Sequence, residues 1–123
     1  MAKLSYVETK PLIWISGSRK ETAELPKPVR GSFGHRLWQV QQGKMPRDMK
    51  MLPEIGRGVY ELRESFDGNA YRLAYIANLQ SGVYVLHAFV KKSKSGIGIP
   101  KPNLERIQAR LKKALAMDAE EEK

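Results

Sequence analysis

The sequence predicts an α+β fold, in which a small antiparallel sheet has two helices before it in the chain and one helix after it. Three observations lead to this prediction. Residues 60–93 are rich in β-branched and aromatic side chains, as strands are. Within them, the dipeptide Asp67-Gly68 is typical of a tight turn between two strands. On either side of this segment, apolar residues recur every three or four positions, as they do on one face of a helix.

The first predicted element is a strand at residues 11–16, "PLIWIS", which combines β-branched and aromatic residues. A short helix should follow and end near Leu25. Ser18 is expected to cap this helix, and Glu21 to reach back as the second half of a capping box. The sequence thus predicts a strand and a short helix before the first proline pair.

The second predicted helix has one apolar face, formed by Val29, Phe33, Leu37 and Val40. These residues are three or four positions apart, so they share one side of a helix. Gly43 follows and is a natural helix end.

The remaining elements are a loop, three strands and a helix. Residues 44–58, "KMPRDMKMLPEIGRG", show no regular period and are predicted to form the loop. The strands follow, joined by Asp67-Gly68 and by a looser turn near residues 80–82. The last helix should begin near Pro102 or Asn103, and its acidic end, residues 118–123, should fray. Its predicted apolar face consists of Leu104, Ile107, Leu111 and Leu115.

The composition predicts one domain over residues 1–123, with its core at about residues 12–115. The chain has no cysteine and 2 histidines, too few ligands for a structural zinc site, so we expect no metal and no cofactor. No segment approaches the roughly 20 apolar residues of a membrane span. The N-terminal residues also lack the pattern of a signal peptide. A cytoplasmic protein without membrane contact is therefore expected.

The charge points to a polyanionic partner. The chain has 22 Lys and Arg against 13 Asp and Glu, a formal net charge of +9. Such a surface attracts nucleic acid, which is the partner that the composition favours.

Two arginines of the predicted hairpin, Arg63 and Arg72, fall opposite each other. If Asp67-Gly68 forms a two-residue turn, counting back along both strands aligns them. Facing like charges are unfavourable unless an anion lies between them, as phosphate does in arginine forks. We interpret the pair as a phosphate site whose repulsion is a stability cost accepted for function. The alternative is that each arginine binds a nearby carboxylate, Glu61 or Glu64, or faces water.

A basic cluster, Lys91, Lys92 and Lys94, ends the last predicted strand. It either guards a sheet edge or continues a path of phosphate contacts, and its nearness to the arginines favours the path. Further candidate RNA contacts in the preceding loop are Arg57 and Lys50.

His87 lies in the last predicted strand, where an isolated histidine is more often structural than catalytic. The alternation along this strand leaves open which face the histidine takes. The sequence holds no glycine-rich phosphate loop, no paired carboxylates at an interpretable spacing and no Ser-His-Asp arrangement. Kinase, glycosidase and metalloenzyme functions are therefore not indicated.

The segments "GVYELRESFDGNAYRLAYI" and "VYVLHAFVKKSKSGIGIPKPNLERIQARLKK" together resemble the RelE/HigB superfamily of type II toxins, in its phage-derived HigB-like branch. The resemblance covers about residues 12–115. It implies a RelE-like fold and an endoribonuclease, or mRNA interferase, that cleaves messenger bound in the ribosome without a metal. It also implies a cognate antitoxin, expected to be a helix-turn-helix DNA-binding protein.

The resemblance carries roles to individual residues. Arg72 matches the sheet arginine of the family, and Lys92, or Lys91 if the register shifts, matches the basic residue that closes the last strand. Arg63 lies where a basic residue of the catalytic strand is expected. These cations would hold the phosphate.

The general base is less clearly indicated, and the candidates are Glu61, His87 or a lysine with a lowered pKa. The chain departs from better-known RelE proteins at Glu61, where they tend to have lysine, and in lacking a terminal catalytic tyrosine. A noncatalytic nucleic-acid-binding module, an inactive toxin homologue and a small phage structural protein remain as alternatives.

Overall fold

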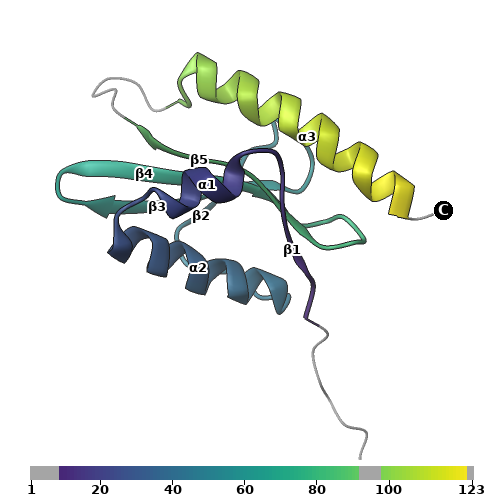
Figure 1. Cartoon of the computed structure of the whole chain (residues 1–123), viewed down its shortest axis with the longest axis horizontal. Coiled ribbons are helices and arrows are strands. Elements are labelled where there is room, and N and C mark those ends of the chain that lie inside the picture. The colour runs from purple at the N-terminus through teal and green to yellow at the C-terminus, as the bar shows by residue number, and fades with distance from the viewer. Residues whose placement is uncertain (1–8, 92–97, 122–123) are drawn as a thin grey trace, which may run out of the picture.

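The computed structural model describes residues 9–91 and 98–121. Its elements, labelled in Figure 1, confirm the predicted α+β class with two N-terminal helices and a C-terminal helix. In chain order they are β1 (Leu12–Trp14), α1 (Ser18–Ala23), α2 (Lys27–Gln41), β2 (Met49–Met51), β3 (Val59–Phe66), β4 (Asn69–Ile76), β5 (Val83–Lys91) and α3 (Lys101–Glu121).

The strands of the described chain form one sheet in the order β1-β5-β4-β3-β2. The pairs β3–β4 and β4–β5 are antiparallel, as expected, and β2–β3 is antiparallel too, whereas β1 runs parallel to β5, so the sheet is mixed. The strand β2 corrects the prediction of an uninterrupted loop at residues 44–58. Three residues are too few to leave a periodic pattern, and they become a strand because the edge of β3 offers hydrogen-bonding partners.

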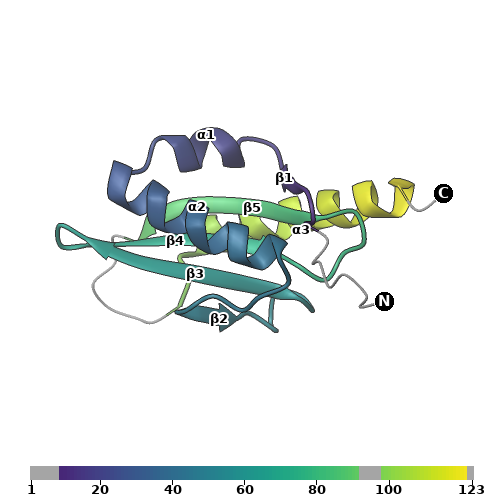
Figure 2. The ribbon, with the colours of Figure 1, turned by 90° about the horizontal axis from the view of Figure 1, so that it is seen from below.

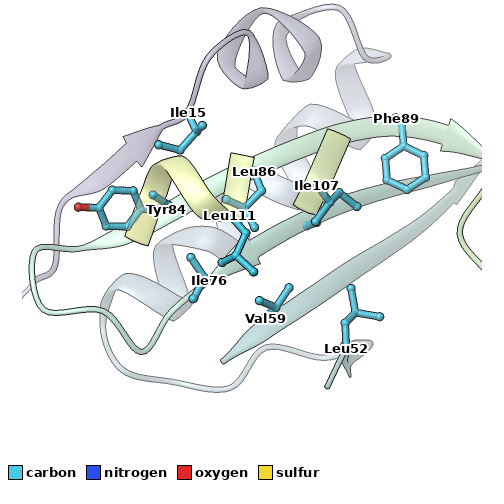
Figure 3. Close-up of a cluster of buried hydrophobic side chains, with 11 residues drawn as sticks. Ile15, Leu52, Val59, Ile76, Tyr84, Leu86, Phe89, Ile107 and Leu111 are labelled. Carbon is cyan, nitrogen blue, oxygen red and sulfur yellow. The ribbon is translucent and has the colours of Figure 1, made fainter. Parts of the chain in front are cut away.

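Two helices cover opposite faces of this sheet. Figures 1 and 2 show α3 on one face and α2 on the other, with the sheet between them. The predicted apolar face of α2 is confirmed, since its four residues are all buried, and the helix ends before Gly43, whose φ is +81°. On the other face, a buried cluster joins α3 to the sheet through side chains that include Val59, Ile76, Leu86, Ile107 and Leu111 (Figure 3).

Two expectations about α3 are wrong. Leu115 is 45% exposed, and the small Ala114 takes its place against the sheet. The helix also continues through Glu121 instead of fraying at Asp118, which is 5% exposed. The Asp118 carboxylate accepts hydrogen bonds from the backbone N–H groups of Gln80 and Ser81, at 3.1 and 2.8 Å. The acidic residue therefore fastens the helix to the β4–β5 turn.

The predicted capping box of α1 is also wrong. Gly17 is the N-cap residue and makes no side-chain cap, while Ser18 is fully buried. Glu21 instead points toward β5, where it accepts hydrogen bonds from the sheet. None of the helices in the described part of the chain is long and apolar enough to cross a membrane.

Candidate functional site

Several of the predicted site residues lie on the sheet face that α3 partly covers. Cross-strand partners share a face, as do alternate residues along a strand, so aligned residues form rows across the sheet. From β2 to β5, the first row is Lys50, Glu61, Ala74 and His87. The second row, from β3 to β5, is Arg63, Arg72 and Phe89. The third is Ser65, Ala70 and Lys91.

The register confirms that Arg63 faces Arg72, as the hairpin count predicts. The two arginines share one carboxylate. Arg63 Nε donates to Glu61 Oε1 at 3.1 Å, and Arg72 Nη1 donates to Glu61 Oε1 and Oε2 at 3.2 and 3.3 Å. The structure therefore realises the alternative interpretation in a modified form, with one carboxylate shared by both arginines.

Burial divides this group into a fixed part and an open part. Glu61 is 1% exposed and the Arg72 side chain 8%, whereas the Arg63 side chain is 42% exposed. Arg72 Nε is buried and has no hydrogen-bond partner among the described residues. Glu61 therefore holds Arg72 in place, while Arg63 faces solvent beside it.

Two lysines complete a cationic group, defined here as the basic face: Lys50, Arg63, Arg72 and Lys91 around Glu61. Four cations and one carboxylate leave a net charge of +3, from the residues just named. Loss of hydration lowers the pKa of Lys91, and the nearby charges of Arg72 and Arg63 lower it further, against an opposing effect of Glu61. The two arginines thus disfavour the charged form of Lys91.

A hollow of about 540 Å³ adjoins the basic face at the sheet edge. Arg47, Lys50 and Arg63 contribute cations to its lining, and Asp48 and Glu64 contribute carboxylates. The pairing of β2 with β3 ends at Leu62, and the hollow lies beside the residues of β3 that follow. The basic face therefore opens onto a solvent-accessible edge.

His87 lies outside the basic face, although it shares the sheet surface. It is 2% exposed and stacks on Phe89, with ring centroids 4.8 Å apart. Its Nδ1 lies 2.8 Å from Glu21 Oε1 and its Nε2 lies 2.9 Å from Asn103 Nδ2. Both ring nitrogens are engaged, which favours the structural interpretation of this histidine.

Glu21, which the sequence predicts as a capping-box residue, instead binds β5 and α3 through its carboxylate. We call this set of contacts the Glu21 hub. Besides His87, Glu21 Oε1 accepts hydrogen bonds from the Ala88 backbone N–H at 3.3 Å and from Arg110 Nη1 at 2.8 Å. Arg110 Nη1 also donates to the Leu86 carbonyl at 2.9 Å. In the described chain, β1 pairs with residues 83–85 of β5. Beyond them, Glu21 and Arg110 are the hydrogen-bond partners of backbone groups at the edge of β5.

Stability at acid pH should depend on Glu21. Burial alone raises the pKa of this carboxyl, but hydrogen bonds from His87 and Arg110 outweigh it and lower the pKa from 4.5 to about 2. Because the folded pKa is the lower one, the contribution is complete above pH 4.5 and is lost as the pH falls toward 2. The contribution of the ionised Glu21 carboxylate to the free energy of unfolding is on the order of 3 kcal/mol. Urea unfolding of the protein and of Glu21→Gln should show a difference in unfolding free energy at pH 7 that shrinks by pH 2.5. A constant difference would contradict this role.

The other predicted RNA contacts fall in different places. Arg57 is exposed in the turn before β3 and lines a separate hollow with Pro53 and Tyr60. It precedes Val59, the first residue of β3, which lies four strand residues, or about 13 Å, from Arg63. Arg57 is therefore not part of the basic face. Lys92 and Lys94 lie outside the described residues.

Sequence reasoning missed Arg36, which is 2% exposed on the inner side of α2. Its guanidinium binds Glu64 Oε1 at 2.8 Å, and Ser32 donates a short hydrogen bond to the same oxygen. It also donates to the carbonyls of Arg47, at 3.2 Å, and Arg63, at 2.8 Å, where β2 and β3 separate. A signal was available, because an arginine three residues after Phe33 falls on the apolar helix face.

Within the described ranges, no three His, Cys, Asp or Glu side chains gather as a metal site would require. The expectation that the protein needs no metal stays a prediction.

Comparison with known families assigns the chain. A family model described as phage derived protein Gp49-like (DUF891) matches residues 20–112, which is more than half of the chain. The chain belongs to the Gp49-like family. This family is associated with RelE-like and toxin-like proteins. No curated protein matches the chain. The matched range of the Gp49-like chain includes every described residue of the basic face and the Glu21 hub.

Proposed function

We propose that this Gp49-like protein is the toxin of a type II toxin–antitoxin system, of the HigB-like branch, and that it cleaves messenger RNA bound in the ribosome. The observation that carries the proposal is the basic face, which groups four cations from neighbouring strands around one buried carboxylate. The family's association with toxin-like proteins and the sequence resemblance support the choice of RNA as substrate.

The basic face suits a phosphate in two ways. Its net positive charge attracts the RNA backbone, and arginine can meet phosphate oxygens with two donors at once. Glu61 fixes the Arg72 guanidinium before any ligand arrives, so little reorganisation is needed when charge develops on the phosphate. Such preorganised cations are the main means by which a protein stabilises a charged transition state.

The proposed reaction is an internal phosphoryl transfer. A base removes the proton of a ribose 2′-hydroxyl, and the 2′-oxygen attacks the adjacent phosphorus. The bond from phosphorus to the 5′-oxygen breaks, and the leaving oxygen takes up a proton. The products are a 2′,3′-cyclic phosphate and a 5′-hydroxyl. Arg63 and Arg72 stabilise the charge on the non-bridging oxygens.

Among the three kinds of base that the sequence leaves open, a lysine fits best by its position on the basic face and by the direction of its pKa shift. Lys91 is half-buried on the same face as the arginines, and its lowered pKa increases the fraction of neutral amine. We therefore assign the base role to Lys91.

Expression without the antitoxin tests the proposal. We expect tightly induced expression to arrest growth, because messenger cleavage stops translation, and purified protein to cut messenger on isolated ribosomes. Reaction products should carry 5′-hydroxyl ends, which polynucleotide kinase labels without prior phosphatase. The Arg63→Ala variant, expressed at the same level, should inhibit growth less strongly. Normal growth at high soluble expression of the unaltered protein would count against a toxin.

A noncatalytic RNA-binding module is the second candidate, and the engagement of Glu61 and His87 favours it. In that case the protein binds ribosomal or messenger RNA through the basic face and leaves it intact. RNA incubated with ribosomes and protein would then stay full-length while Arg63→Ala still weakens binding.

A further inference from the structure

The outer face of α2 carries an exposed aromatic pair. Trp38 is 49% exposed, and His35, one helical turn earlier, stacks on it with ring centroids 6.0 Å apart and an interplanar angle of 22°. Lys44 Nζ lies 5.9 Å from the Trp38 ring centroid. The core uses the opposite side of α2, so packing does not explain a tryptophan at this position.

A second hollow, of about 340 Å³, lies on the same side of α2 as His35. Among the described residues, its lining contains Ser32, His35, Arg36, Gln39 and Arg47 and no carboxylate. Arg47 also lines the hollow at the sheet edge, which contains Lys50 and Arg63. The two hollows therefore adjoin at Arg47. Together they form a basic path from Arg63, around the β2–β3 edge, to the aromatic pair; Figure 2 shows how α2 lies along this side of β3.

Arg47 can exchange its present partner for a phosphate. It contacts Asp48 at 2.7 Å, and the two side chains are 64% and 61% exposed. Ion pairs so open to water are weak. Its longer contact, 3.5 Å to Glu64, involves a carboxylate that buried Arg36 already binds at 2.8 Å.

We infer that single-stranded RNA next to the scissile phosphate runs along this basic path and stacks a base on Trp38. The location of the scissile phosphate rests on the function proposed above; the affinity of the α2 face for RNA does not. Cations spaced along the path match the repeated phosphates of the strand, and an exposed aromatic ring accepts any base. Stacking of one base on such a ring changes affinity by about tenfold or more.

Binding of an uncleavable probe tests this inference separately from cleavage. We choose a fluorescent 2′-O-methyl oligoribonucleotide of about 10 nucleotides, a length within the usual range of single-strand sites, which lacks the attacking hydroxyl. By fluorescence anisotropy, Trp38→Ala should weaken binding about tenfold, and Trp38→Phe, which keeps a ring, should restore most of it. A 2′-O-methyl dinucleotide, whose single phosphodiester cannot occupy both Arg63 and Arg47 along the path, should depend little on Trp38 and bind both proteins similarly.

Leu115→Ala is the matched control, because Leu115 is 45% exposed on α3, away from the path. It should bind the long probe like the unaltered protein, and the melting temperatures of all variants should agree. Unchanged affinity of Trp38→Ala for the long probe would overturn the inference, and would be the result if the aromatic pair bound a protein partner instead. If the protein proves to cleave nothing, a tenfold loss still supports the α2 path. If Arg63→Ala lowers cleavage while Trp38→Ala binds the long probe normally, only the path fails.

Discussion

Arg72→Ala is expected to lower messenger cleavage by at least about 100-fold, the scale of removing one preorganised contact from a charged transition state. The side chain is 8% exposed and donates to both oxygens of Glu61, so its guanidinium has a fixed place on the basic face. Single-turnover cleavage of messenger on purified ribosomes measures the effect.

The same change should also reduce stability, which corrects the expectation of a repulsive arginine pair. Glu61 lies between the two cations and attracts both, so neutralising Arg72 leaves a buried carboxylate with one partner. Arg63→Ala separates the two effects, because Arg63 is 42% exposed and its loss should spare the fold. We expect a smaller but clear loss of cleavage for this variant. Arg30→Ala, exposed on α2, is the charge-matched control. Cleavage by Arg63→Ala equal to that of the control would show that the pair has only a structural role.

Glu61→Ala should lower the free energy of unfolding by about 3 kcal/mol, because it leaves the buried Arg72 without its anion. Chemical unfolding at pH 7 measures the loss, and the exposed Glu54→Ala serves as control. A loss no greater than that of the control would mean that the ion pair contributes little.

Glu61→Gln distinguishes holding the arginines from acting as the base. The amide keeps an acceptor oxygen for them but cannot take a proton. If Glu61 only positions Arg72, the variant should retain measurable cleavage, with its pH profile shifted to lower pH because the Glu61 charge no longer raises the pKa of Lys91. If Glu61 were the base, cleavage would drop steeply and the residual rate would no longer fall at acid pH.

The β3–β4 hairpin and its register followed from the sequence because both rest on a local signal. Asp67-Gly68 fixes a two-residue turn, with φ of +52° and +79° in the structure, and that turn alone sets Arg63 against Arg72. The face of α2 was likewise predictable from spacing. By contrast, β2 and the hydrogen bonds of Asp118 depend on partners distant in the chain, which no local pattern reveals.

The candidate site was predicted in part for the same reason. Alternation places Arg63, Arg72 and Lys91 on particular strands, but only the pairing of β4 with β5 puts Lys91 on their face. The sequence offered two carboxylates, Glu61 and Glu64, as possible partners of the arginines. Which of them binds Arg63 and Arg72 depends on the face of the sheet that each occupies, and Glu61 is the one on their face. Glu64 takes the other face and binds Arg36.

The Glu21 hub also limits how the sheet can grow. Glu21 and Arg110 occupy the backbone groups of Ala88 and Leu86 that another strand would need, and β1 occupies those nearer the start of β5. At the opposite side, β2 has three residues, and Arg36 takes the carbonyl of Arg63 beyond it. Both borders are thus closed by side chains or very short strands, which is how small sheet proteins prevent strand addition by other copies. Within the described residues, the sheet therefore offers another copy of the chain no long strand border through which to polymerise.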